Sequence, residues 1–76
     1  MFEIYGVTIT YYENDMPLIE EASGKSLKTA INNALLKGIS VDSVASVDVA
    51  EVLSGRKYAL SENEFQKLLM KNSIVR

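Results

Sequence analysis

The chain has 76 residues, 47% of them hydrophobic, and a formal net charge of −2, which fits one small globular domain spanning residues 1–76. It contains no histidine, cysteine or tryptophan, so the usual general base, the most nucleophilic side chain and the leading zinc ligands are all missing. This composition excludes Ser-His-Asp and Cys-His mechanisms, zinc fingers and disulfides. It predicts a non-enzymatic protein with no cofactor and no metal site.

Residues 2–12 are rich in β-branched and aromatic side chains and predict a β-strand. Alternation places Tyr5, Val7, Ile9 and Tyr11 on the expected core face, and Phe2, Ile4, Thr8, Thr10 and Tyr12 on the other. Gly6 indicates either a bulge or the close approach of another backbone. The strand ends at Glu13-Asn14-Asp15, which predicts a turn.

Residues 16–22 predict a returning strand, with Met16, Leu18 and Ala22 on its inner side. Pro17 cannot donate a hydrogen bond to a neighbouring strand. The sequence therefore predicts that this strand lies at an edge of the sheet or begins at Pro17.

An amphipathic helix follows. Its apolar stripe has the spacing of one helix face and consists of Leu27, Ala30, Ile31, Ala34 and Leu35. Ser26 is the expected N-cap, and Gly38 is placed to end the helix in the left-handed conformation, with Ile39 as the accompanying hydrophobic contact.

Residues 41–53 alternate well enough to predict a long strand, with Val41, Ser43, Ala45, Val47 and Val49 sharing one face. The pattern slips at residues 51–53, which indicates a bulge or the end of the strand. Ser54-Gly55 then predicts a two-residue hairpin turn before a short strand over residues 56–60.

The second helix has a capping box, Ser61-x-x-Glu64, with Leu60 and Phe65 as the expected hydrophobic staple. Phe65, Leu68, Leu69 and Asn72 continue the helical spacing. Residues 73–76 are either the fraying end of this helix or a very short strand.

The order ββαββα predicts an α+β fold in which two helices cover one face of an antiparallel sheet of about four strands. The alternative is a βαββαβ, ferredoxin-like arrangement that omits the strand over residues 16–22 and uses residues 73–76 instead.

Two motifs suggest chemistry, and both are weak. Gly24-Lys25-Ser26 looks like the end of a phosphate-binding loop, but Ile19 occupies the position where that motif needs its first glycine. Glu20 and Glu21 are adjacent, so they point to opposite faces of a strand and do not form a catalytic pair.

Nucleic-acid binding is an alternative function, because Tyr5, Arg56, Lys57 and Tyr58 offer aromatic and basic groups on the sheet. The segment around Tyr58 lacks the glycine and aromatic spacing of the RNP1 motif. An acidic chain also starts with an unfavourable electrostatic contribution toward phosphate, so nucleic acid is the less favoured partner.

The favoured function is a small protein-binding module of the kind that phages and mobile elements use as inhibitors or adaptors, acting by occluding a host protein. Residues 1–23 carry five acidic and no basic side chains, an asymmetry typical of a strand pair's polar covering or of a surface for a basic partner. The expected contact surface contains Phe2, Ile4, Tyr12, Glu13, Asp15, Glu20 and Glu21. We further expect a homodimer, because residues 2–12 are apolar on one face and half-apolar on the other, beyond what two short helices need to cover. A cytoplasmic location and no membrane association are expected because neither a signal peptide nor a long apolar run is visible.

Overall fold

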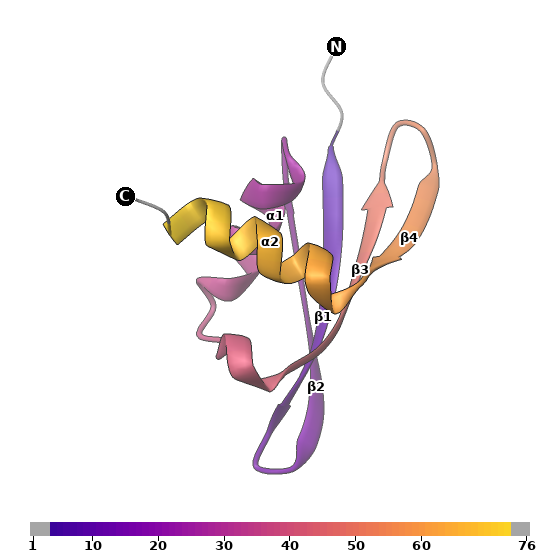
Figure 1. The fold of residues 1–76 in the computed structure, drawn as a ribbon. Helices are drawn as coiled ribbons and strands as arrows, with labels where there is room; N and C mark the ends of the chain where they lie inside the picture. The colour runs from indigo at the N-terminus through magenta and orange to yellow at the C-terminus, as the bar shows by residue number, and fades with distance from the viewer. Residues whose placement is uncertain (1–3, 74–76) are drawn as a thin grey trace.

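The computed structural model describes the backbone of residues 4–73 and the side chains of residues 4–69. In chain order the elements are β1 (Tyr5–Glu13), β2 (Met16–Gly24), α1 (Leu27–Leu35), the 3₁₀ turn η1 (Val41–Ser43), β3 (Val44–Glu51), β4 (Arg56–Leu60) and α2 (Glu62–Ser73). The four strands form one antiparallel sheet in the order β2-β1-β3-β4 (Figure 1). The predicted ββαββα order is confirmed.

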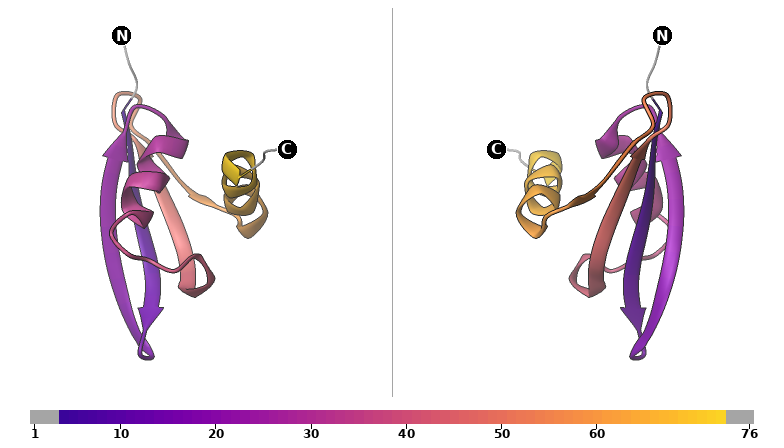
Figure 2. Two further views of the ribbon diagram at one scale, coloured as in Figure 1. Left: turned by 90° about the vertical axis from the view of Figure 1, so that its left-hand side faces the viewer. Right: turned by 90° about the vertical axis from the view of Figure 1, so that its right-hand side faces the viewer.

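The ferredoxin-like alternative is wrong, because residues 16–24 form β2 and pair with β1 along their whole length. Ser73 is the last residue of α2, and residues 74–76 lie outside the described part of the chain. Both helices lie on the same side of the sheet, and α2 stands farther from it than α1 (Figure 2). Within the described residues, no helix is long and apolar enough to cross a membrane.

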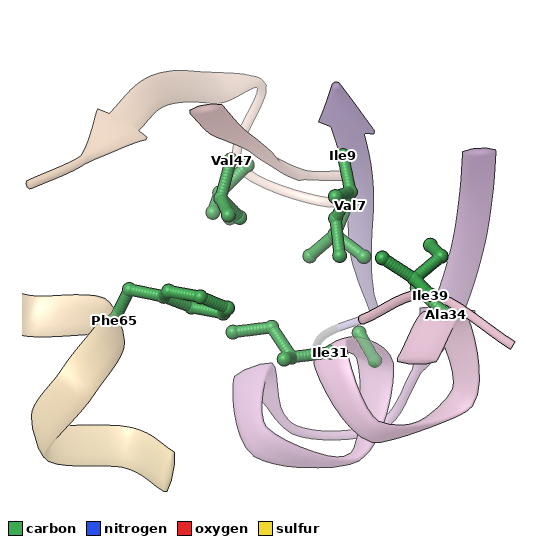
Figure 3. Close-up of a cluster of buried hydrophobic side chains, with 9 residues drawn as sticks. Val7, Ile9, Ile31, Ala34, Ile39, Val47 and Phe65 are labelled. Atoms are coloured by element: carbon green, nitrogen blue, oxygen red, sulfur yellow. The ribbon is translucent and has the colours of Figure 1, made fainter. Parts of the chain in front are cut away.

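The core lies between the sheet and the two helices, as the alternation of β1 predicts. Its centre is Ile9, which is 0% exposed and lies on the central strand β1. The buried side chains are Val7, Ile9, Ala30, Ile31, Ala34, Ile39, Val47, Val49 and Phe65 (Figure 3). Tyr5 and Tyr11 pack at the margin of this cluster. The predicted core face of β1 is therefore confirmed.

The β1–β2 hairpin turns through Asn14 and Asp15, which both have positive φ (54° and 64°). Consecutive positive φ values are typical of the two-residue turns that match strand twist, and asparagine and aspartate tolerate them better than most residues. β2 is an edge strand, so the prediction drawn from Pro17 is confirmed. Met16 shares the core face with Glu13 but is 60% exposed, contrary to expectation, because the hairpin tip extends beyond α1 (Figure 1).

Both predicted ends of α1 are confirmed. The Ser26 hydroxyl accepts a hydrogen bond from the Thr29 backbone N–H at 3.1 Å. Gly38 has a φ of 101° and is followed by the buried Ile39. The last turn is tightened by bonds from Lys37 N–H to the Ala34 carbonyl and from Gly38 N–H to the Leu35 carbonyl.

The long strand predicted over residues 41–53 is wrong at its start. Residues 41–43 form η1, because both the N–H and the hydroxyl of Ser43 donate to the Ser40 carbonyl and close a tight local turn. The pairing with β1 shifts between Thr10 and Tyr11, opposite Ser46 and Val44. This bulge leaves Ala45 exposed instead of on the core face.

The prediction that the strand ends near residue 51 is confirmed, since β3 ends at Glu51. The turn that follows has four residues, 52–55, instead of the predicted two. A hydrogen bond from Gly55 N–H to the Glu51 carbonyl (2.8 Å) closes this wider turn.

The capping box of α2 is present as predicted. The Ser61 N–H donates to Glu64 Oε1 at 3.0 Å, and the Glu64 N–H donates to Ser61 Oγ at 3.1 Å. Phe65 is 5% exposed, and Leu60 packs against the same cluster. The cap therefore fixes where α2 begins, and Phe65 anchors it to the core.

Candidate functional site

The face of the sheet opposite the helices is the main uncovered surface of the fold (Figure 2). The strand register gives the side chains that share it. One row across the four strands is Glu21, Thr8, Asp48 and Ala59, and the next is Ser23, Gly6, Ala50 and Lys57. We call this surface the open face.

These two rows line a shallow hollow of about 830 Å³ that extends across all four strands. Small residues form much of its floor, one from each strand: Ser23, Gly6, Ala50 and Ala59. Because their side chains are short, a partner can approach the sheet backbone more closely here than over large side chains. The hollow therefore results from the small size of these residues on the four strands.

No contact or backbone conformation within the described residues requires a glycine at position 6. The register through Gly6 is regular, which removes the bulge explanation, and an added Cβ would have only the Ala50 carbonyl oxygen within 4 Å, at 3.9 Å. Gly38 and Gly55 adopt positive φ, and a Cβ on Gly24 would lie 2.8 Å from the Ala30 nitrogen. Of the four glycines, Gly6 alone faces open space without a conformational need.

Two carboxylates and one ammonium group set the charge of the open face. Glu21 and Asp48 flank Thr8 on the neighbouring strands, about 10 Å apart at the usual strand spacing. Neither forms an ion pair with another described residue. Lys57 lies in the next row, so the face carries more negative than positive charge.

The structure divides the predicted acidic contact surface between two faces. Tyr12 and Glu21 belong to the open face, and Tyr12 is 51% exposed, whereas Ile4 precedes β1 and is 43% exposed. Glu13 and Glu20 belong to the helix face, and Glu20 Oε2 forms an ion pair with Lys37 Nζ at 3.1 Å. Asp15 is exposed in the hairpin turn, and Phe2 lies outside the described residues.

The free edge of β2 is partly blocked. On this edge Lys37 Nζ donates to the Glu21 carbonyl at 2.8 Å, and Asn33 Nδ2 donates to the Ser23 carbonyl at 2.9 Å. Pro17 has no N–H to offer at the other end of the strand. Side chains and proline of this kind protect edge strands from pairing with another chain. The edge is therefore less suited to strand addition than the open face is to surface docking.

The four residues considered for nucleic-acid binding do not share a face. Lys57 belongs to the open face, whereas Tyr5, Arg56 and Tyr58 lie on the helix face, with β3 between the two tyrosines. Glu51 engages this group: the Tyr58 hydroxyl donates to Glu51 Oε2 at 3.1 Å, and Arg56 lies 3.6 Å from Oε1. The Arg56 guanidinium also lies 5.3 Å from the centroid of the Tyr58 ring.

The environment of Tyr58 is consistent with an internal role. Burial, together with the hydrogen bond and negative charge of Glu51, raises the pKa of the Tyr58 hydroxyl above its usual value of 10.0. Arg56 is 68% exposed, but Glu51 offsets its charge, and the Arg56 guanidinium lies over the Tyr58 ring, which leaves that ring less open to stacking on a base.

Comparisons with known proteins give no further guide. No protein-family model, curated protein or solved structure matches the chain. Among the described residues, no group of three or more acidic side chains is arranged to hold a metal ion. The candidate site is therefore defined by the geometry of the open face alone.

Sequence reasoning missed most of the residues of this site. Asp48, Ala50 and Ala59 were not singled out, and Gly6 was noted only as a local feature. Alternation within each strand does contain the signal, since it assigns these residues to faces. The register between strands was needed to place them side by side.

Proposed function

We propose that the protein is a small protein-binding module whose binding surface is the open face of its sheet. The observation that carries this proposal is a hollow lined by small side chains from all four strands, on a face that neither helix covers. An antiparallel sheet commonly has one face on the core and the other in solvent, so the support for a binding surface comes from the hollow and not from exposure alone.

Three features support this site over the alternatives. The β2 edge is blocked by Lys37, Asn33 and Pro17, which disfavours strand addition. The tyrosine group is engaged by Glu51 and Arg56, which disfavours nucleic-acid stacking. On the open face, no described side chain blocks the hollow in a comparable way. Such a module acts by covering part of its partner, as an inhibitor or adaptor does, and self-association remains a prediction to be measured.

The test uses a large side chain placed in the hollow. Ala59 is exposed on the open face, whereas Ala45 is exposed at the bulge, outside the residues that line the hollow. Tagged wild type, Ala59→Arg and Ala45→Arg are used to capture proteins from the source cell. A partner retained by wild type and Ala45→Arg but lost by Ala59→Arg is the expected result.

Two controls complete this experiment. Circular dichroism establishes that both variants fold, and light scattering establishes the number of copies in each. Equal retention of the partner by Ala59→Arg and Ala45→Arg would show that binding does not use the open face.

A further inference from the structure

We propose that copies of this chain associate head to tail, with the β1–β2 hairpin of one copy packed on the β3–β4 turn of the next. The inference goes beyond the proposed function, because it uses the two ends of the sheet and not the hollow between them. Exposed apolar side chains at both ends, and opposite charges around them, support this contact.

The tip of the β1–β2 hairpin exposes large apolar side chains. Pairing between β1 and β3 ends at Tyr11 and Val44, so residues 12–17 extend beyond the sheet as a two-stranded ribbon, and all residues from 12 to 19 are exposed. Alternation places apolar side chains on both faces of this end of the hairpin. We call them the hairpin patch: Tyr12, Met16, Leu18 and Ile19. A ribbon that is apolar on both faces is stabilised when another surface covers it.

The β3–β4 turn, at the opposite end of the sheet, is also apolar (Figure 1). Val52 and Leu53 are more than half exposed there, although turns favour glycine, asparagine, aspartate and serine. The backbone hydrogen bond that closes the turn joins Gly55 to Glu51 and uses neither side chain. The Val52 N–H donates to the Ile4 carbonyl at 2.9 Å, which brings the exposed Ile4 beside the turn. We call Ile4, Val52 and Leu53 the turn patch.

Opposite charges surround the two patches. Glu13 and Asp15 lie at the hairpin tip, and neither forms an ion pair with another described residue. Beside the turn, Arg56 pairs with Glu51, and Lys57 adds a positive charge that forms no ion pair with a described residue. The hairpin end is therefore acidic and the turn end basic, so each attracts the other.

A second copy supplies the complement of each patch. β1 spans nine residues, about 30 Å at the usual rise per residue, so the two patches of one copy do not meet. Contact between two hairpins would bring four carboxylates together, because each copy contributes Glu13 and Asp15, and contact between two turns would bring positive charges together. Contact between hairpin and turn instead joins apolar to apolar and acid to base.

Such a contact leaves one free hairpin and one free turn on every pair of copies. Further copies can therefore add until a ring closes or a filament grows, as is general for interfaces formed by two different surfaces.

The experiment uses the full-length protein alone. Sedimentation velocity and the amide shifts of the ¹⁵N-labelled protein are followed from micromolar to millimolar concentration. Because only a few large side chains form each patch, we expect weak association, with a mass that rises with concentration. The concentration-dependent shifts should fall on both ends of the sheet, at residues 12–19 and 52–57.

Two variants each disable one end. Ile19→Lys places a base in the hairpin patch, Leu53→Asp places an acid in the turn patch, and each variant alone should associate about tenfold more weakly than wild type. An equimolar mixture should recover association, because one variant retains an intact turn and the other an intact hairpin. The matched controls are Leu36→Lys and Leu36→Asp, since Leu36 is exposed and lies outside both patches. Both controls should associate as wild type does.

Circular dichroism establishes that every variant folds, as the exposure of these side chains predicts. A wild type that stays monomeric at every concentration would overturn the inference and leave both patches to a different partner. Shifts confined to one end, unchanged association in either variant, or a mixture that associates no better than its components would also overturn it. A loss of association in Ala59→Arg equal to that in Ile19→Lys would place the contact in the hollow instead. The proposed function is tested separately, because it depends on capture of another protein.

Discussion

Replacement of Phe65 by alanine should release α2 from the sheet while the sheet and α1 stay folded. Among the described side chains of α2, Phe65 is the one fully buried residue, at 5% exposure, and Leu68 and Leu69 are half-buried. Among its described side chains the helix therefore has a single fully buried anchor, Phe65, which contacts the core beside Ile31 (Figure 3), while Leu68 and Leu69 pack at the margin of the cluster.

The magnitude follows from that burial. Truncating a buried phenylalanine to alanine costs about 3–5 kcal/mol. A domain of this size has a free energy of unfolding of about 4–11 kcal/mol in total. The lower figure of about 3 kcal/mol raises the opening equilibrium of α2 roughly a hundredfold, because each 1.4 kcal/mol is a factor of ten. Detaching one helix is then easier than unfolding the whole domain.

Amide hydrogen exchange measures this directly. In Phe65→Ala, the amides of α2 should exchange about a hundredfold faster than in wild type, while those of Val7, Ile9 and Val47 stay protected. Leu36→Ala is the control, since Leu36 is 81% exposed and its truncation should cost less than about 0.5 kcal/mol. Unchanged protection in α2, or an equal loss of protection in α2 and β1, would refute the single-anchor reasoning.

Two further predictions concern the sheet. Gly24→Ala should lower the free energy of unfolding by about 1–3 kcal/mol, because the added Cβ would meet the backbone of α1. Gly6→Ala should not lower it, because a Cβ there has only the Ala50 carbonyl oxygen within 4 Å. Thermal denaturation compares the two variants, and equal effects would contradict the packing argument. The raised pKa of Tyr58 means that its contribution to stability is complete below the usual tyrosine pKa and is lost as the pH rises through the folded-state pKa. Urea unfolding between pH 8 and 11 should therefore show an alkaline loss that is smaller in Tyr58→Phe, and an identical loss in both proteins would exclude this role.

Local signals predicted the elements of the fold well where one segment contains the whole interaction. The capping box at Ser61 and Glu64, the N-cap at Ser26 and the left-handed Gly38 each involve groups within a few residues. Such contacts form wherever the local backbone forms, so spacing along the sequence is enough to predict them.

Predictions from the sequence were wrong where contacts with another element determine which side chains are buried. Alternation alone placed Ala45 on the core face, but pairing with β1 shifts at Tyr11 and puts Val44 there instead. Met16 was expected on the inner side, yet no part of α1 reaches the hairpin tip to cover it. The acidic contact surface was divided for the same reason, since Glu20 turns toward α1 and pairs with Lys37.

The sequence by itself determined the order ββαββα, both helix starts and the buried face of β1, because periodicity and capping are properties of single segments. Only the tertiary structure decided that Gly6, Ala50, Asp48 and Ala59 share one hollow and that Glu51 engages Arg56 and Tyr58. The physical reason is register. Residues far apart in the chain become neighbours through hydrogen bonds between strands, and those bonds are made by backbone groups that every sequence carries.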